Sequence, residues 1–387
     1  MAVKKNRTKK KSLNLQSKTL GIIGASQLAL YLAQAARQSG YITKGMSYKK
    51  NDPATSWFNK WTKGKSNRLQ DISKMTQQSS SIIFENKTHL DLKTLKSLSQ
   101  KKMQFFPELD LNTKMNDLWT LKELFYDYEL PQTSFIKING KDDLDQAFTF
   151  FKKKMVLKSR FSFKNKQDTF IIKSILDLNK FKLSHKGKES HFIAEEFTIF
   201  RSEHRIIIAR NHSNEFSIYP LMTLNLIGNN YDIVSTVRFI NNKSTATVNK
   251  NFDFIIEKIK KLLTAINYNG VMTFNLFNAK NMLYLNDADA RPCNTGMITL
   301  DGFNINQFDL HIRAILNLKL PEVIQYKENL YCKYLIAGQA DQVSFNQKMN
   351  VDTINQTLSK YKNGKLYWYG KDEKRPNRKL GHINYTN

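Results

Sequence analysis

The chain has 387 residues, 41% of them hydrophobic and 12% aromatic, which is enough for two or three domains and argues against a disordered protein. Its formal net charge of +28 favours phosphorylated ligands and polyanions. The two cysteines, Cys293 and Cys332, disfavour a disulfide framework and suit a reducing cytoplasm, and no apolar run approaches the ~18 residues that a membrane span requires.

A basic segment, residues 1–17, opens the sequence, and six of the first eleven residues are Lys or Arg. Because no apolar stretch follows these charges, the segment is not predicted to be a secretory signal. We expect a solvated, disordered tail, with an arm that binds nucleic acid or a membrane surface as the alternative. No zinc spacing, recognition-helix pattern or RNA-binding aromatic motif accompanies the charge. Nucleic-acid binding is therefore the last-ranked function, and no membrane partner is expected.

The stretch GIIGASQLALYLAQAARQSGY, residues 21–41, predicts a strand, a tight turn and a helix, because its apolar residues recur at helical spacing after the turn. Small residues at such a turn often admit a phosphate, although an ordinary turn without a ligand fits equally well. The turn lacks the three glycines and the downstream acid of a dinucleotide fingerprint, which disfavours NAD. A strand at 81–86, a helix at 91–100 and a helix at 113–130, stopped by Pro131, complete a predicted parallel α/β domain.

In the middle of the chain the alternation of strand and helix patterns gives way to several strands in succession, which predicts an α+β domain. Strands are expected at 154–159 and in close succession from 191 to 223. An amphipathic helix follows at 248–268, with an apolar face made of Phe254, Ile255, Ile259, Leu262, Leu263 and Ile266. A hairpin at 270–287, turning near 278–281, and a helix at 305–316 come next, before Pro321 introduces a last segment. The expected units are residues 18–110, 111–322 and 323–387.

Three groups of polar residues could carry chemistry. Asn286 and Asp287 close a predicted strand, and an acid beside an amide can hold Mg²⁺, although a turn rich in Asn and Asp has the same composition. Lys158 ends another strand, where a lysine often serves as a point charge for phosphate, although chance is a competing explanation in a Lys-rich chain. A cationic loop is predicted between two short strands near the C-terminus, with its charges and imidazole on Lys371, Arg375, Arg378, Lys379 and His382.

Read in order, these segments resemble the 5-(carboxyamino)imidazole ribonucleotide synthases, ATP-grasp enzymes of purine biosynthesis. The similarity runs from about residue 18 to 385. It is carried by the opening turn with Gln27, by Phe84-Glu85-Asn86, by VLKSR at 156–160 and by AEEF at 194–197. Two longer blocks are the most specific parts of the match: NDADARPCNTGMITLDGFNINQFDLHIRAILNLKLP, residues 286–321, and YGKDEKRPNRKLGHIN, residues 369–384.

The resemblance implies an N-terminal α/β (pre-ATP-grasp) domain, an ATP-grasp middle domain and a small C-terminal β-rich domain. It also implies two chemical steps, in which ATP phosphorylates bicarbonate to carboxyphosphate and the amine of aminoimidazole ribonucleotide captures the carboxyl unit. Carried over by position, the residues implied for ATP are Lys122, Lys158, Glu195, Glu196, Phe197 and Glu203. Those implied for Mg²⁺ are Asp287 and Asn275, and those for bicarbonate or carboxyphosphate are Arg291 and Asn294. Those implied for the ribonucleotide are Gln27, Glu85, Lys371, Arg375 and Arg378. A cytoplasmic homodimer is the assembly that the resemblance implies.

Several positions depart from the pattern of the family. The family's glycine-rich loop over the ATP phosphates is replaced by FSFKNKQDTF, residues 161–170, without a glycine. Asn275 stands where the family has a metal-binding Glu, and Asp287 replaces the second Glu. Cys293 replaces a His and is interpreted as a small apolar filler. A synthase with a weakened ATP and Mg²⁺ site is the first hypothesis. A non-catalytic relative that still binds the ribonucleotide, and a basic nucleic-acid-binding protein, are the alternatives.

Overall fold

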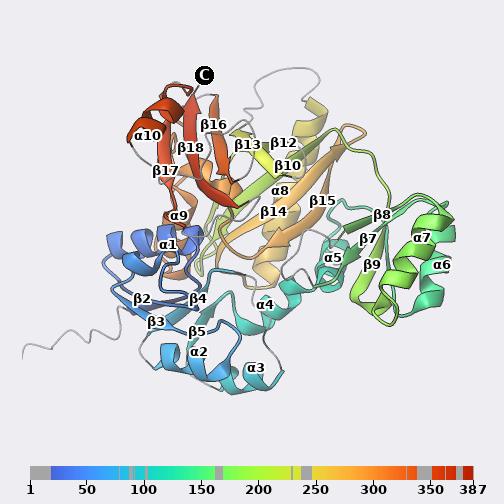
Figure 1. Ribbon diagram of the computed structural model, residues 1–387, viewed down its shortest axis with the longest axis horizontal. Coiled ribbons are helices and arrows are strands. Elements are labelled where there is room, and N and C mark those ends of the chain that lie inside the picture. Colours follow the sequence, from blue (N-terminus) through green and yellow to red (C-terminus); the bar gives the residue numbers. More distant parts are fainter. Residues whose placement is uncertain are drawn as a thin grey trace, which may run out of the picture.

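The computed structural model describes residues 19–77, 79–86, 90, 92–100, 103–161, 169–227, 230–236, 246–327, 329–337, 351–361, 363–371 and 378–386. The predicted tail at 1–17, most of the segment that replaces the glycine loop, and Arg375 lie outside these ranges. Within them the strands form three sheets, of five, nine and four strands (Figure 1). No helix among the described residues is both long and apolar enough to cross a membrane.

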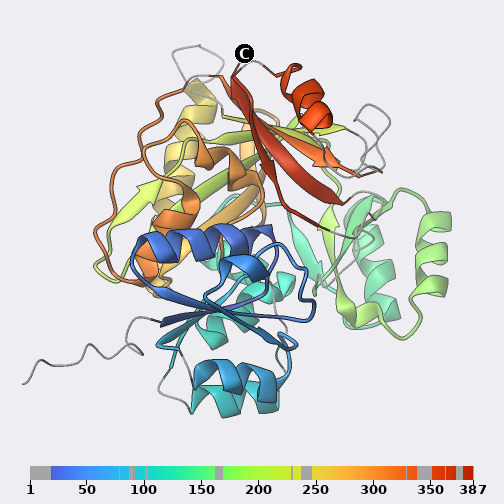
Figure 2. The same ribbon diagram turned by 60° about the vertical axis from the view of Figure 1, so that its left-hand side comes forward.

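The N-terminal domain is a parallel sheet with strand order β3-β2-β1-β4-β5. Its strands are β1 (Thr19–Ile23), β2 (Ile42–Ser47), β3 (Lys60–Lys63), β4 (Ser81–Phe84) and β5 (Gln104–Phe106). Its helices are α1 (Gln27–Gln38), α2 (Leu69–Thr76) and α3 (Leu92–Ser99). Helix α1 covers one face, whereas α2 and α3 cover the other (Figure 2). The predicted parallel α/β domain is therefore confirmed.

Two helices replace the single helix that was predicted at 113–130. They are α4 (Leu109–Asn116) and α5 (Leu118–Asp127). The break falls at Asp117, whose backbone is extended and whose side chain accepts a hydrogen bond from the Trp119 amide, which makes it the N-cap of α5. Its carboxylate also pairs with Arg160, so the break is tied to the residue that follows β7 (Met155–Ser159). The break aims Lys122, on α5, toward the site described below.

A separate lobe holds a four-stranded sheet of order β6-β9-β7-β8, which lies to the right in Figure 1. Its strands are β6 (Phe135–Lys137), β7 (Met155–Ser159), β8 (Thr169–Ile172) and β9 (Phe192–Glu196). Its helices are α6 (Lys141–Phe150), α7 (Ile175–Ser184) and the 3-10 helix Glu189–His191. The lobe has its own apolar core, so its strands are fixed independently of the larger sheet.

The largest sheet has the order β15-β14-β10-β12-β13-β16-β18-β17, with β11 paired to β10. Its strands from the middle of the chain are β10 (Ser202–Arg210), β11 (Phe216–Ile218), β12 (Met222–Ile227), β13 (Asn230–Thr236), β14 (Gly270–Ala279) and β15 (Met282–Asp289). Its C-terminal strands are β16 (Leu330–Ile336), β17 (Lys365–Trp368) and β18 (Lys379–Thr386). The pairing of β13 with β16 makes the β-rich C-terminal segment a continuation of the sheet from the middle of the chain. The limits near residues 110 and 322 stay predictions.

Helices α8 (Ala246–Ala265), α9 (Gln307–Ile315) and α10 (Val351–Leu358) accompany this sheet. Helix α9 packs between β14 and α1, and a continuous apolar core joins the N-terminal domain to the large sheet. Two expectations are wrong in detail. Phe254 of α8 is 45% exposed, and Ile256 is buried instead. Lys379 and His382 lie in β18 rather than in the preceding loop, which ends at Arg378.

Candidate functional site

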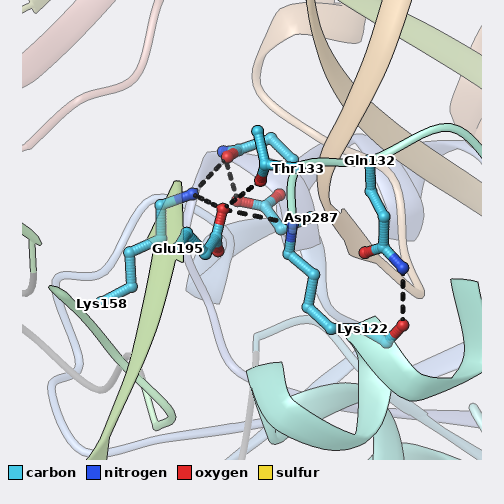
Figure 3. Close-up of polar contacts among 7 residues, drawn as sticks. Lys122, Gln132, Thr133, Lys158, Glu195 and Asp287 are labelled. Carbon is cyan, nitrogen blue, oxygen red and sulfur yellow. Dashed lines mark hydrogen bonds and ion pairs between the residues drawn. The ribbon is translucent and has the colours of Figure 1, made fainter. Parts of the chain in front are cut away.

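Two lysines and a glutamate from three elements meet at one point between the small lobe and the large sheet (Figure 3). The Nζ atoms of Lys122 and Lys158 lie 3.3 and 3.0 Å from Oε2 of Glu195. The antiparallel register of β7 and β9 puts Lys158 and Glu195 on the same face, one diagonal step apart. The Thr133 hydroxyl donates to the same oxygen over 2.8 Å, so this carboxylate is held from three sides.

Burial sets the electrostatics of this cluster. Lys122 is 0% and Glu195 2% exposed. Burial lowers the pKa of Lys122 to about 8, and the neighbouring Lys158 adds to this while Glu195 opposes it. Burial alone would raise the pKa of Glu195, but the two lysines outweigh it and hold that pKa at about 2. Two lysine side chains therefore share the single carboxylate of Glu195, and such an excess of cationic groups suits phosphate oxygens.

A hairpin brings the predicted metal residues to the same place. The register of β14 and β15 sets Asn275 opposite Asp287, and a bulge leaves Asn286 without a cross-strand partner. Asn286 accepts a hydrogen bond from Lys158 over 2.6 Å. The amides of Asn275 and Asn286 both donate to the Asp287 carboxylate. The hairpin is thus tied to the lysine cluster through Asn286.

The donor set of the hairpin fits a magnesium ion with a single protein charge. Asp287 supplies one carboxylate, and the amide oxygen of Asn275 would face the ion if that amide rotated by half a turn, whereas the oxygen of Asn286 is held by Lys158. No group of three or more His, Cys, Asp or Glu with metal-binding geometry occurs in the described ranges. One or two carboxylates together with substrate phosphates are the usual protein contribution to Mg²⁺, so the site meets the minimum.

A second pocket, of about 730 Å³, opens between the N-terminal turn and the C-terminal segment. Gln27, Lys371 and Arg378 line it, together with Ser26 and Asn86. The predicted ribonucleotide residues from the two ends of the chain therefore share one cavity. Its size is typical of a pocket for a small molecule.

Glu85 lies beneath the wall of this pocket, 1% exposed. It accepts hydrogen bonds from the Ser26 hydroxyl and from Nδ2 of Asn86, the latter over 2.9 Å. Burial raises its pKa, and the hydrogen bond from Ser26 and the charge of Arg291 oppose the rise. Gly24 has φ of +114°, and a Cβ there would lie 2.1 Å from the Glu85 carboxylate, so this turn position requires glycine.

Arg291 and Asn294 join the pocket to the hairpin. An Arg291 guanidinium nitrogen donates to the Glu85 carbonyl oxygen over 3.0 Å. Nε2 of Gln27 donates to Oδ1 of Asn294 over 2.7 Å, and the Tyr334 hydroxyl donates to the Asn294 carbonyl oxygen. Asn294 is therefore held from α1 on one side and from β16 on the other.

Lys371 carries the charge at the far side of the pocket. Its Nζ donates to the Lys379 carbonyl oxygen over 2.8 Å and lies 5.1 Å from the centre of the Tyr369 ring. Burial, reinforced by the charges of Arg378 and Lys379, lowers the pKa of Lys371 to about 7. The charge of this residue thus changes close to neutral pH.

Three domain families match the chain in succession. They are the ribonucleotide synthetase preATP-grasp domain at residues 17–113, the ATP-grasp domain at 123–308 and the phosphoribosylaminoimidazole carboxylase C-terminal domain at 338–387. Similar curated proteins carry this arrangement over nearly their whole length. The N5-carboxyaminoimidazole ribonucleotide synthase of Synechococcus elongatus is 25% identical over 94% of this chain and 88% of its own. That of Staphylococcus aureus is 24% identical over 94% and 91%.

The chain has the three domains of the N5-carboxyaminoimidazole ribonucleotide synthase type, in order. Solved structures share the fold. The Staphylococcus aureus N5-carboxyaminoimidazole synthetase, complexed with ADP, superposes with a TM-score of 0.82 at 22% identity, covering 96% of this chain and 93% of its own. The Aspergillus clavatus enzyme, in complex with ADP and 5-aminoimidazole ribonucleotide, gives 0.81 at 20% identity, covering 96% and 94%.

The other residues predicted for ATP have surroundings of their own. Glu196 is exposed, and the Phe197 ring lies 5.3 Å from the Lys173 ammonium. Glu203 lies at the start of β10 and is 3.5 Å from Arg205. The predicted roles of these residues toward ATP stay predictions. Sequence reasoning missed Thr133 and Tyr334, because a lone Thr before a strand and a Tyr within a strand are ordinary local patterns.

Proposed function

We propose that this chain catalyses the ATP- and bicarbonate-dependent carboxylation of 5-aminoimidazole ribonucleotide through carboxyphosphate. The observation that carries this proposal is Arg291, which lies three residues before Asn294 and reaches from the Asp287 hairpin to the Glu85 backbone. It links the cluster suited to ATP phosphates with the pocket suited to the ribonucleotide. An intermediate formed at the first would then have a short path to the second. The relatives named for this activity support the same conclusion.

The proposed steps assign each group a task. Lys122 and Lys158 neutralise the ATP phosphates while a bicarbonate oxygen attacks the terminal phosphorus and ADP leaves. Arg291 and Asn294 bind the resulting carboxyphosphate. Magnesium, when bound at Asp287, would supply further neutralisation of phosphate charge. The ribonucleotide amine then attacks the carboxyl carbon, the carbon–oxygen bond to phosphate breaks, and the amine loses a proton.

The direct test is ADP release in the presence of Mg²⁺, bicarbonate and aminoimidazole ribonucleotide. We expect ADP and the carboxylated product in equal amounts, and no product when bicarbonate is removed. Turnover of about 1–10³ per second is ordinary for enzymes. Light scattering on the same sample tests the homodimer that we also propose. If no ADP is released above background while the ribonucleotide still binds, the catalytic proposal is refuted.

One observation favours a second candidate, a non-catalytic protein that retains ribonucleotide binding. Asn275 donates a hydrogen bond to Asp287 where the family has a second carboxylate, so the hairpin carries a single acid at this point. A site with less negative charge binds Mg²⁺ more weakly and slows phosphoryl transfer. This candidate shares the pocket around Gln27 and Lys371 with the first but lacks its turnover. The ADP assay separates the two.

Restoring the second carboxylate with Asn275→Glu is expected to tighten Mg²⁺-dependent ATP binding by about tenfold, because it adds a hard, charged ligand beside Asp287. Calorimetric titration of ATP with and without Mg²⁺ measures this. Met282→Glu is the matched control, since it adds the same charge at the other end of the hairpin and should leave the affinity unchanged. Equal affinities for Asn275→Glu and the unaltered protein would contradict the metal assignment of this hairpin.

Ribonucleotide affinity is expected to fall by about tenfold between pH 7 and pH 9. The pKa of Lys371 lies at about 7, so its ammonium is present below that pH and is lost above it. The 5′-phosphate is fully dianionic over this window, so the loss of one charge-assisted hydrogen bond dominates. Titrations of aminoimidazole ribonucleotide across the window measure the effect. Lys371→Arg keeps its charge and should flatten the profile, whereas a flat profile in the unaltered protein would refute the assignment.

A further inference from the structure

A third cavity, of about 780 Å³, lies between the N-terminal domain and β17. Six aromatic residues line it: Tyr31, Trp57, Trp61, Tyr367, Trp368 and Tyr369. Three of the chain's four tryptophans are therefore gathered at one place. They come from the 3-10 helix Thr55–Trp57, from β3 and from β17, so two domains build the wall together.

Tyr31 and Tyr369 belong to the buried apolar core, and the three tryptophans form the accessible part of the wall. Trp57 is 40% exposed, and Trp61 and Trp368 are partly exposed. The Trp61 indole N–H donates to the Ser47 hydroxyl over 3.0 Å, and the Tyr367 hydroxyl donates to Asp301 over 2.7 Å. Because these polar atoms are already bonded within the protein, the surface that the cavity presents to a ligand is mainly aromatic. A planar heterocycle is the chemistry that such a wall takes up.

A smaller, basic cavity of about 460 Å³ adjoins the aromatic one and shares Lys50, Asn51 and Asp52 with it. Its other lining residues include Lys49, Lys63 and Arg378. Four cations therefore face a single acid, Asp52. The Lys63 ammonium also lies 5.5 Å from the centre of the Tyr48 ring, on the same wall. Such an excess of positive charge at the edge of an aromatic cavity complements a phosphate group.

We propose that the aromatic and basic cavities together bind a mononucleotide, with its base among the tryptophans and its phosphate at Lys50 and Lys63. The site is distinct from the 730 Å³ pocket but touches it, because Asp52 and Pro53 line both. Arg378 belongs to the basic cavity and to the pocket. Two phosphates that draw on one guanidinium weaken each other's binding, so the nucleotide lowers the affinity for the ribonucleotide, and the reverse holds equally. Only this coupling rests on the proposed function.

The test uses the full chain labelled with 5-fluorotryptophan, whose four ¹⁹F resonances are assigned by single Trp→Phe variants. Guanosine 5′-monophosphate is the probe. It should shift the resonances of Trp57, Trp61 and Trp368 and leave that of Trp119, which lies on α5 one turn before Lys122, unchanged. Shifts confined to Trp119 would place the probe at the lysine cluster, and no shift at millimolar probe would show that there is no such site; either result overturns the proposal.

Variants separate the two halves of the site. Lys50→Ala combined with Lys63→Ala, both at exposed positions, should raise the dissociation constant of the probe at least tenfold. The matched control, Lys180→Ala combined with Lys186→Ala at exposed positions of the small lobe, should not change it. Guanosine, which lacks the phosphate, should bind about tenfold more weakly than its monophosphate. Equal affinities would refute the role of the basic cavity, and equal shifts from ribose 5-phosphate would refute that of the aromatic wall. None of these outcomes depends on ADP release, so this inference and the proposed activity can fail separately.

Discussion

Replacing Glu195 by leucine is expected to destabilise the protein by about 3–5 kcal/mol, because it removes one partner of a buried ion cluster. Lys122 is 0% exposed, and its ammonium would be left beside Lys158 with no opposing charge on Glu195. Most of this destabilisation comes from leaving buried ammonium groups without a counter-charge, and less comes from the attraction that is lost. Urea unfolding at pH 7, followed by circular dichroism, measures the difference in the free energy of unfolding.

Glu196→Leu is the matched control, since its side chain is exposed one residue further along β9, and it should change stability by less than about 0.5 kcal/mol. Adding Lys122→Met to Glu195→Leu should recover part of the loss, because the pair then interacts non-additively. The low pKa of Glu195 also means that its contribution is complete above its unfolded pKa and is lost as the pH falls toward 2. A loss below about 1 kcal/mol at pH 7 would contradict the buried cluster.

Lys158→Met is expected to weaken ATP binding and to lower turnover by about 10²–10³-fold, the range for removing one preorganised donor from a reacting oxyanion. Lys158 is the more accessible of the two lysines, at 17% exposure, and it reaches both Glu195 and Asn286. Its loss therefore removes a positive charge from the place where the small lobe meets the hairpin. Calorimetry with ATP gives the binding effect, and ADP release gives the rate.

The substitution should leave ribonucleotide affinity unchanged, because Lys158 does not line the pocket around Gln27 and Lys371. Lys154→Met, at an exposed position before β7 of the same lobe, serves as the control for a lost surface charge and should leave ATP affinity within twofold. Unaltered ATP affinity in Lys158→Met would show that the lysine cluster is purely structural. The proposed site would then have to lie elsewhere.

Much of the architecture follows from local signals in the sequence. Apolar runs bounded by turn residues gave β1, β4 and the β14–β15 hairpin, and helical spacing gave α1, α8 and α9. The short strands β3 and β5 were missed because they offer only three or four residues to a periodic pattern. The break at Asp117 was also missed, since an acidic N-cap within a continuous helical pattern is visible only once the chain changes direction there.

The residues of the candidate site also fall into those that the sequence reveals and those that only the structure reveals. Lys158, Asp287, Arg291 and Lys371 stand in long motifs and were found by their order along the chain. Tyr334 stands in no motif, yet it donates to the Asn294 carbonyl oxygen. Gln307 stands in the block that begins at residue 286, but only the structure shows that its buried side chain bonds both the amide and the carbonyl of Cys293. Cys293 packs against the apolar core, as its interpretation as a filler predicts. Such supporting contacts join distant segments, so only the folded chain displays them.

The hydrogen bond between Gln27 and Asn294 has a consequence for how the protein folds, because it spans 267 residues of sequence. Arg291 and Glu85 are joined across 206 residues, and Lys371 and Arg378 come later still. Contacts between residues so far apart in the sequence form slowly, because the long loops between them must close first. During synthesis the N-terminal sheet emerges hundreds of residues before the partners of its own turn. The pocket around Gln27 and Lys371 is therefore among the last parts of the molecule to assemble, and a chain that ends before residue 371 would lack it.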